Sequence, residues 1–256
     1  MTDAAAPLLE VSELGYAYGE RVAVDGVGFT LARGEVLGLL GPNGAGKTTA
    51  ISCICGLLTP RSGSLRFQGR PFEPHRTAAD RVHLGVVPQE LALYDGLSAR
   101  QNLRFFGSLH GLEAKGGALD EAVDRGLSLS GLASRADDKV KTFSGGMKRR
   151  LNLAVAMLGE PELALLDEPM VGVDPQSRHH IFESIEQLKT DGRGMLYTSH
   201  SMDEVERLCD RIAILDGGRL VATGTADELA TQAGLDGADL EKTFLELTGH
   251  SLRDGG

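Results

Sequence analysis

The sequence has few basic residues and no long apolar run. Its 26 lysines and arginines are outnumbered by 36 aspartates and glutamates, giving a formal charge of −10 at pH 7. A general nucleic-acid-binding protein normally carries a basic face, so no nucleic-acid partner is expected. No window approaches about 18 uninterrupted apolar residues, which argues against a membrane-spanning helix. The segment Met1-Thr2-Asp3-Ala4 lacks the basic and apolar regions of a secretory signal, so none is expected.

Cysteine is also scarce. Cys53, Cys55 and Cys209 are too few, and odd in number, for a disulfide framework. The first two form a C-x-C rather than a C-x-x-C pattern and lie in an apolar stretch. We expect all three to be buried, reduced thiols without a chemical role, in a protein of the cytosol. The 256 residues suffice for one large domain or two small ones.

Five short apolar runs predict buried strands. They occupy residues 36–40, 84–87, 163–166, 195–198 and 212–215. Each lies next to a helical pattern, and strands that alternate with helices are typical of an α/β fold with a parallel sheet. Strand-like stretches at residues 11–18, 22–31 and 65–67 predict an additional small antiparallel layer.

Two helical regions are expected outside this pattern. Between about residues 91 and 160 the strand runs give way to helical spacing, as in Leu103, Phe106 and Leu109, which predicts an inserted helical subdomain. After Gly224, residues 226–247 predict two short amphipathic helices. The apolar face of the second helix fits either packing against the core or a dimer contact; it consists of Leu240, Phe244 and Leu247.

The first buried strand runs into a phosphate-binding motif. The residues Gly41, Pro42, Asn43, Gly44, Ala45, Gly46, Lys47 and Thr48 fit the P-loop pattern G-x-x-x-x-G-K-[ST]. Its glycines let backbone N–H groups face the phosphates, and the next helix points its positive end at them. We expect Lys47 to contact the β- and γ-phosphates and Thr48 to ligate Mg²⁺. A Rossmann dinucleotide turn is excluded, because it would need glycine where Thr49 stands. Thr49, next to the P-loop, is counted with the ATP-binding residues.

Polar residues follow three other expected strands. Asp167 and Glu168 come directly after residues 163–166; beside a P-loop, Asp167 is expected to serve Mg²⁺ and Glu168 to activate a water. Gln89 and His200 also stand at strand ends, where they can reach Mg²⁺ and the γ-phosphate. Taken alone, the acidic pair fits a solvated strand end, Gln89 a helix cap and His200 a structural histidine. Their common position at strand carboxyl ends favours function.

A second anion-binding feature precedes the helical pattern at residues 147–158. Ser144, Gly145 and Gly146 offer a hydroxyl and bare N–H groups at the positive end of that helix. They predict a second phosphate-binding tip, although an ordinary N-cap with a flexible lead-in also fits. The basic residues that follow, Lys148, Arg149 and Arg150, fit either reading.

This ordered set of motifs, completed by Gly172-Val173-Asp174, resembles the nucleotide-binding domain of ATP-binding cassette (ABC) proteins over residues 8–224. The resemblance implies a P-loop NTPase (RecA-like) α/β core with the antiparallel layer, the helical subdomain at about 91–160, and a C-terminal helical extension at 225–256. It also implies ATP and Mg²⁺ as ligands and a head-to-tail dimer of identical chains that encloses two ATP molecules.

Individual roles follow from the same resemblance. Tyr18 matches the aromatic residue that stacks on adenine, and Gln89 the residue that links Mg²⁺ to the transmembrane partner. Glu168 and His200 match the catalytic base and the switch histidine. The residues expected to act on the opposite subunit are Ser144, Gly145 and Gly146, which match the tripeptide that grips its γ-phosphate, and Asp174, which matches the loop that crosses the dimer interface. Phe143 and Met147 depart from the usual Leu and Gln of that tripeptide's context.

Two functional classes fit an ABC chain of this kind. One is the ATP-hydrolysing subunit of a transporter, bound to a separate membrane permease on the cytosolic side. The other is a soluble ABC ATPase that acts on a protein scaffold, as in iron–sulphur assembly. Residues 85–90 with Leu93-Tyr94, 147–151 and 240–249 resemble the drug- and antibiotic-exporter (daunorubicin-resistance-like) branch and favour the first class.

The family receives its permease just beyond Gln89. The candidates for this contact are Tyr94, Leu97, Phe105 and Phe106, although the phenylalanines fit packing within the helical subdomain equally well. The transported compound is not readable here, because in this architecture the permease carries selectivity.

Overall fold

The computed structural model describes residues 6–113, 117–237, 239–250 and 252. The first four residues, on which the expectation about a secretory signal rests, lie outside this part of the chain. So do residues 238, 251 and 253–256 of the expected C-terminal extension.

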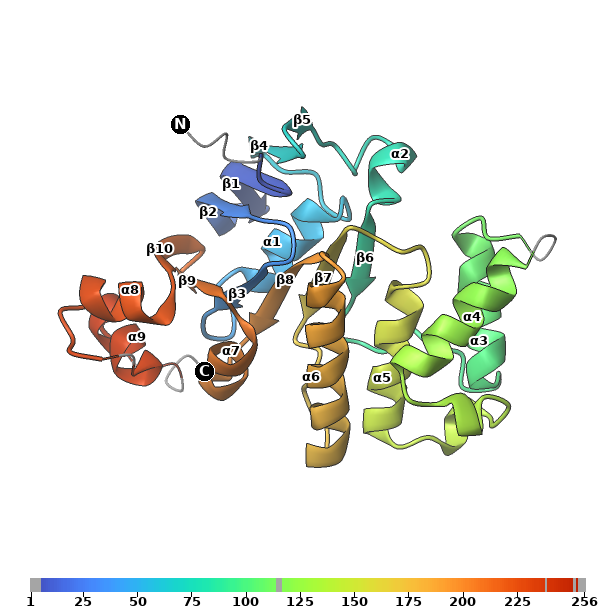
Figure 1. The fold of residues 1–256 in the computed structure, drawn as a ribbon. Helices are drawn as coiled ribbons and strands as arrows, with labels where there is room; N and C mark the ends of the chain where they lie inside the picture. Colours follow the sequence, from blue (N-terminus) through green and yellow to red (C-terminus); the bar gives the residue numbers. More distant parts are fainter. Residues whose placement is uncertain (1–5, 114–116, 238, 251, 253–256) are drawn as a thin grey trace.

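A six-stranded sheet forms the centre of the molecule (Figure 1). Its order is β10-β9-β3-β8-β7-β6. The parallel strands are β3 (Val36–Leu40), β6 (Leu84–Val87), β7 (Leu163–Asp167), β8 (Gly194–Ser199) and β9 (Arg211–Asp216), while β10 (Arg219–Gly224) pairs antiparallel with β9. Every residue of β3, β7 and β8 is buried, as expected for parallel strands covered on both faces. The predicted parallel sheet is confirmed.

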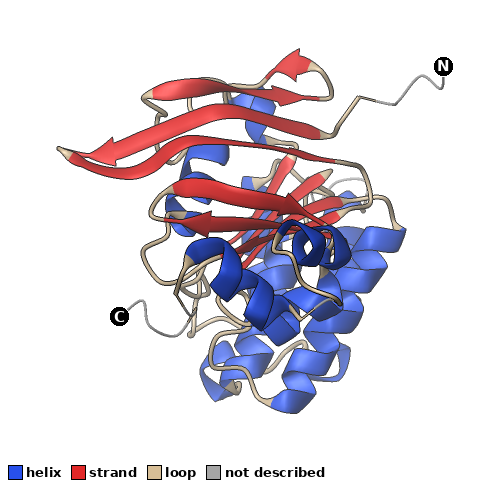
Figure 2. Ribbon diagram, turned by 90° about the vertical axis from the view of Figure 1, so that its left-hand side faces the viewer, coloured by secondary structure: helices blue, strands red, loops and turns tan. Residues whose placement is uncertain are grey.

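The antiparallel layer has four strands in the order β2-β1-β4-β5 (Figure 2). Its strands are β1 (Leu9–Tyr18), β2 (Arg21–Leu31), β4 (Ser62–Phe67) and the short β5 (Arg70–Pro71), which was not expected. Helix α1 (Lys47–Ile54) contacts β1, β2 and β7 and thus lies between the two sheets. A short helix, α2 (Ala78–Arg81), precedes β6.

The helical region packs around its own core beside the sheet (Figure 1). It contains α3 (Ala99–Leu109), α4 (Ala118–Leu129) and α5 (Gly145–Ala156), with 3₁₀ turns at Ala133–Arg135 and Val140–Thr142. Leu103 is fully buried in this core, but Leu109 is 69% exposed. Leu103, Phe106 and Leu109, whose spacing predicted a helix, all lie in α3, which ends at Leu109.

The remaining helices cover the other side of the sheet and its β10 edge. Helix α6 (Pro175–Thr190) shares a core with β7 and β8, and α7 (Met202–Leu208) packs on β3 and β8. The C-terminal helices α8 (Ala226–Gln232) and α9 (Leu240–Thr248) contact β10. Leu240 and Phe244 are buried in a cluster with residues of β9 and α7, so the apolar face of α9 packs against the core.

The cysteines have no disulfide partners. Cys53 and Cys55 are buried and Cys209 partly so. Burial raises the pKa of Cys53 to about 11, which keeps this thiol protonated and unreactive near neutral pH. Among the residues described, no helix is long and apolar enough to cross a membrane.

We expect Phe244→Ala to lower the free energy of unfolding by about 3–5 kcal/mol, because it removes a fully buried ring. Leu245→Ala on the same helix is the matched control: Leu245 is 44% exposed, and its truncation should cost about 0.5 kcal/mol or less. Urea denaturation of the full chain measures both. Equal, small losses would show that α9 contributes little to the fold.

Candidate active site

The site forms where four parallel strands end side by side. β3 leads into the P-loop, β6 to Gln89, β7 to Asp167 and Glu168, and β8 to His200. In a parallel sheet these carboxyl ends share one edge, where ligands of α/β proteins bind. A cleft of about 470 Å³ opens there, and its lining includes Tyr18, residues 43–49, Gln89 and Glu168. This volume is in the usual range for ligand sites.

Lys47 is held within the P-loop by main-chain acceptors. Its Nζ donates hydrogen bonds to the carbonyl oxygens of Gly41 (2.7 Å) and Pro42 (3.0 Å). Burial lowers the pKa of Lys47, although the Glu168 and Asp167 carboxylates act in the opposite direction. The amino group is therefore close to two carboxylates at the base of the cleft.

Gly46 is required by two features of the loop. Its φ is 101°, a left-handed conformation that side chains disfavour. A Cβ atom there would also lie 2.4 Å from the carbonyl oxygen of Ala23. This close approach sets the P-loop against β2 and starts α1 at Lys47.

Asp167 and Thr48 form an oxygen-rich pair next to Lys47. The Thr48 hydroxyl donates to Asp167 Oδ1 at 3.2 Å, and Thr198 of β8 donates to the same oxygen at 2.7 Å. Hydroxyl and carboxylate oxygens are the ligands that Mg²⁺ prefers, so these residues fit that ion. Gln89 is exposed on the same cleft, and Arg149 of α5 donates to its carbonyl oxygen.

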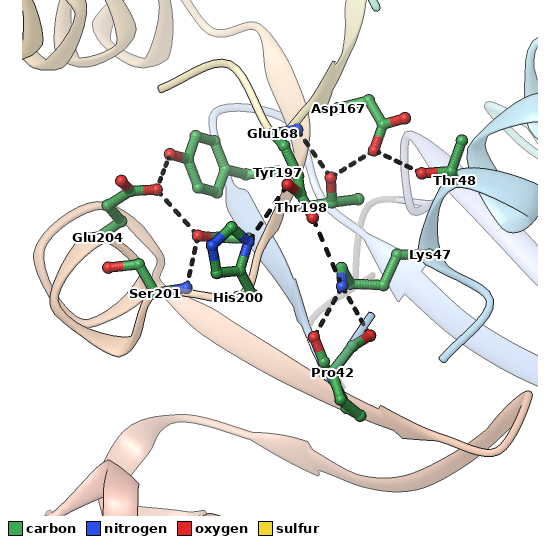
Figure 3. A network of polar contacts seen from close by, with 12 residues as sticks. Pro42, Lys47, Thr48, Asp167, Glu168, Tyr197, Thr198, His200, Ser201 and Glu204 are labelled. Carbon is green, nitrogen blue, oxygen red and sulfur yellow. Dashed lines mark hydrogen bonds and ion pairs between the residues drawn. The ribbon is translucent and has the colours of Figure 1, made fainter. Parts of the chain in front are cut away.

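Glu168 occupies the centre of the site (Figure 3). One carboxylate oxygen lies 3.7 Å from Lys47 Nζ, and the other lies 3.2 Å from His200 Nδ1. Its side chain is 10% exposed, whereas that of His200 is 50% exposed. Glu168 has a φ of 47°, which is uncommon for a residue with a side chain and is often found at functional sites. Its N–H donates to Thr198 Oγ1 at 3.0 Å.

Ser144, Gly145, Gly146 and Asp174 do not line this cleft. Ser144 caps α5 by accepting the Met147 N–H at 3.2 Å, and Asp174 caps α6 by accepting the Ser177 N–H at 3.0 Å. The bond from Ser177 lowers the pKa of Asp174 and keeps it ionised. The N-cap reading of Ser144 therefore holds, and it leaves Gly145 exposed at the helix end.

The two helix starts touch at Gly146. A Cβ atom on Gly146 would lie 2.2 Å from Ser177 Oγ and 2.5 Å from Asp174 Oδ2. Only glycine fits this contact without moving α6. The expected tripeptide and the expected interface aspartate are thus brought together on one surface.

Sequence reasoning missed several residues of the site. Thr198 bridges Asp167 and Glu168, and it is the register partner of Asp167 across β7 and β8. Gly217 and Gly218 line the cleft from the β9–β10 turn, and Gly218 N–H donates to the Ala45 carbonyl of the P-loop at 3.1 Å. The Gly-Gly pair between two strands signalled a tight turn, but nothing in the sequence placed it against the P-loop.

Comparisons with known proteins agree with this geometry. The family model described as ABC transporter matches residues 24–171. The linearmycin resistance ATP-binding protein LnrL of Bacillus subtilis is 46% identical over 94% of this chain and 75% of its own length. A Nod factor export ATP-binding protein I of Cupriavidus metallidurans is 41% identical over 93% of this chain and 78% of its own.

Solved structures agree as well. A structure described as the ATP-binding subunit of an ABC transporter superposes with a TM-score of 0.84 at 34% identity, covering 94% of this chain and 99% of its own. This chain therefore belongs to the ABC transporter family, as an ATP-binding subunit with ATPase activity.

Proposed function

We propose that this chain binds ATP with Mg²⁺ in the cleft and hydrolyses it to power export through a separate membrane permease. The observation that carries the ATPase mechanism is the position of Glu168, between the P-loop lysine and His200. The transporter assignment rests on the relatives, which are named as resistance and export ATP-binding proteins.

Nucleotide binding uses residues already oriented toward the cleft. Tyr18 is 52% exposed on its wall and offers a ring face to adenine. The P-loop N–H groups and Lys47 hold the phosphates, with Lys47 exchanging its bonds to Gly41 and Pro42 for phosphate oxygens. Thr48, Asp167 and Gln89 would hold Mg²⁺, which neutralises charge on the β- and γ-phosphates.

Glu168 is the proposed general base. A carboxylate at the edge of the cleft accepts the proton of the attacking water as the water approaches the γ-phosphate. His200 contacts the other carboxylate oxygen and so orients the base toward the cleft. Lys47 stabilises the negative charge that develops on the phosphoryl group.

We further propose a head-to-tail homodimer. Ser144, Gly145 and Gly146 lie at the start of α5, where the first N–H groups have no partner within the helix, an arrangement that suits a phosphate. They do not line their own chain's cleft. In a two-fold dimer they contact the γ-phosphate bound by the partner, and Asp174 lies at the same interface.

The permease contact is proposed on the helical region beyond Gln89. Tyr94 and Phe105 are exposed, and their ring centroids lie 4.9 Å apart. Phe106 packs partly into the helical core. This surface would place the chain on the cytoplasmic face of the membrane. The resemblance to the drug- and antibiotic-exporter branch leads us to propose a drug, antibiotic, lipid-like or other hydrophobic cargo. The relatives are named as resistance and export ATP-binding proteins, which does not favour the soluble, scaffold-dependent alternative.

Glu168→Gln should reduce ATP turnover by about 10²- to 10⁴-fold, because the amide cannot accept the proton of water. Nucleotide binding should persist, so ATP should convert the chain to a stable dimer in light scattering. Glu246→Gln, at an exposed position of α9, is the control and should retain full turnover. Normal hydrolysis by Glu168→Gln would exclude Glu168 as the base.

A mixing experiment tests the composite site. Lys47→Ala weakens nucleotide binding, and Gly145→Asp places a carboxylate where the partner's γ-phosphate should bind. Gly145 has room for a side chain, since its Cβ would come no closer than 3.9 Å to Gly172 O, and an acidic residue suits the first helical turn. Each variant alone should be inactive. An equal mixture should recover roughly one quarter of the unsubstituted rate, because half the dimers contain one intact site of two.

No recovery in that mixture, with both variants folded and able to exchange subunits, would contradict a site shared between two chains. Activity of Gly145→Asp alone would place the γ-phosphate contact elsewhere.

Cysteine substitution of Tyr94 or Leu97 should allow cross-linking to a co-expressed permease, because the proposed contact surface includes both. Leu245→Cys is a matched exposed control on α9, at the opposite end of the molecule (Figure 1). Absence of a cross-link in every nucleotide state would rule out this surface.

A further inference from the structure

A buried network lies behind His200. Glu204 of α7 is 6% exposed, and its Oε2 accepts hydrogen bonds from Tyr197 OH (2.8 Å) and Ser199 Oγ (2.9 Å) (Figure 3). Its other oxygen lies 3.9 Å from an Arg178 nitrogen. Burial and the neighbouring carboxylate raise the pKa of Tyr197, so the phenol keeps the proton that it donates. Glu204 does not line the nucleotide cleft.

The local sequence predicts a different arrangement. Residues 201–204, Ser-Met-Asp-Glu, fit the capping-box pattern in which the serine hydroxyl accepts the glutamate N–H and the glutamate accepts the serine N–H. In this structure the Ser201 side chain makes no such bond at the start of α7. Instead, the Ser199 hydroxyl accepts the Ser201 N–H at 2.9 Å and donates to Glu204. The Ser199 hydroxyl thus bridges Ser201 and Glu204, the two residues that would bond directly in the capping box.

This bridge links the residues on either side of His200. Ser199 and Ser201 are its two chain neighbours, and the Ser199 hydroxyl joins them across the histidine. The imidazole is half exposed and contacts the Glu168 carboxylate. Because an exposed ring is little restrained by packing, its place is set by the backbone path from residue 199 to residue 201.

We infer that Glu204 is a positioning residue for ATP hydrolysis: acting through the Ser199 hydroxyl, it fixes the turn that holds His200 Nδ1 against Glu168. The inference rests on the proposed roles of Glu168 and His200. A contact that only joined α7 to β8 would be satisfied by the Tyr197 bond alone. The bond to Ser199 links the same carboxylate to the backbone on both sides of the histidine.

The decisive variant is Ser199→Ala. Glu204→Ala would remove the acceptor of two buried hydroxyls and could unfold the chain, whereas Ser199→Ala breaks the bridge and keeps the Tyr197–Glu204 bond. We expect kcat for ATP hydrolysis by the full chain to fall about tenfold, because a misplaced catalytic group slows the chemical step. KM for ATP should stay within about twofold, because the binding groups are untouched.

Two further variants separate positioning from packing. Ser199→Thr keeps the hydroxyl and should restore kcat to within about threefold of the unsubstituted chain. Ser184→Ala removes another buried serine hydroxyl and should leave kcat unchanged. The Ser184 hydroxyl donates to the carbonyl oxygens of Leu129, at the end of α4, and His180, on α6. Thermal unfolding of each variant reports the accompanying loss of stability.

A double-substitution cycle tests whether the effect passes through His200. In a His200→Gln background, measured in single turnovers over hours, Ser199→Ala should change the rate by less than about twofold, because the group that it positions is already gone. The same tenfold loss in both backgrounds, an equal loss in Ser184→Ala, or full activity of Ser199→Ala would overturn the inference. Absence of hydrolysis by the unsubstituted chain would instead contradict the proposed function.

Discussion

The site depends on the partners that stabilise one buried carboxylate, that of Glu168. Glu168 is nearly covered, and an ionised carboxylate away from water is costly unless charged or hydrogen-bonding partners surround it. Its partners come from the segments that follow two other strands: Lys47 starts the helix after β3, and His200 follows β8. Since the sheet order places β8 between β3 and β7, three segments distant in the chain meet at one side chain.

Strand register extends this constraint into the sheet. Thr198 lies opposite Asp167, so its hydroxyl reaches both the Asp167 carboxylate and the Glu168 N–H. A shift of one residue between β7 and β8 would turn Thr198 to the other face and remove both bonds. The left-handed backbone of Glu168 is thus stabilised from the adjacent strand, and the fold that buries the strands also orients the base.

The sequence was most informative where a pattern has a single physical meaning. Short uninterrupted apolar runs that alternate with helical patterns predicted the parallel strands, because strands covered on both faces carry such runs. The P-loop pattern predicted a phosphate-binding loop directly after β3. The residues at strand ends could be grouped because parallel strands end at one edge. The family resemblance supplied the fold and the ATPase activity, which the comparisons confirm.

Features that depend on a tertiary neighbour could not be predicted in this way. Helical periodicity placed Leu103 and Leu109 on one helix, but it does not reveal that only Leu103 is buried, because burial depends on where the neighbouring helices lie. Periodicity alone also did not show whether the apolar face of α9 packs against the core or forms a dimer contact. In the structure this face contacts α7 and β10, so it packs against the core. Residues 201–204 fit the capping-box pattern, but Ser199, which lies outside the pattern, bonds to the Ser201 N–H and to the Glu204 carboxylate instead.

The contact at Gly146 packs the helical region directly against the part of the molecule built on the central sheet. Helix α5 belongs to the helical region and α6 packs on the central sheet, yet their first turns approach so closely that a single methyl group would not fit between them. Closely packed interiors are hardly compressible, so strain at such a contact passes to the neighbouring helix. Ser144 and Asp174, which cap the two helices, are therefore held at one packed contact, and the Arg178 N–H donates to the Asp174 carbonyl one helical turn further on. We expect a displacement of the α5 N-terminus relative to the P-loop to involve α6 as well, because the first turns of the two helices leave no space between them.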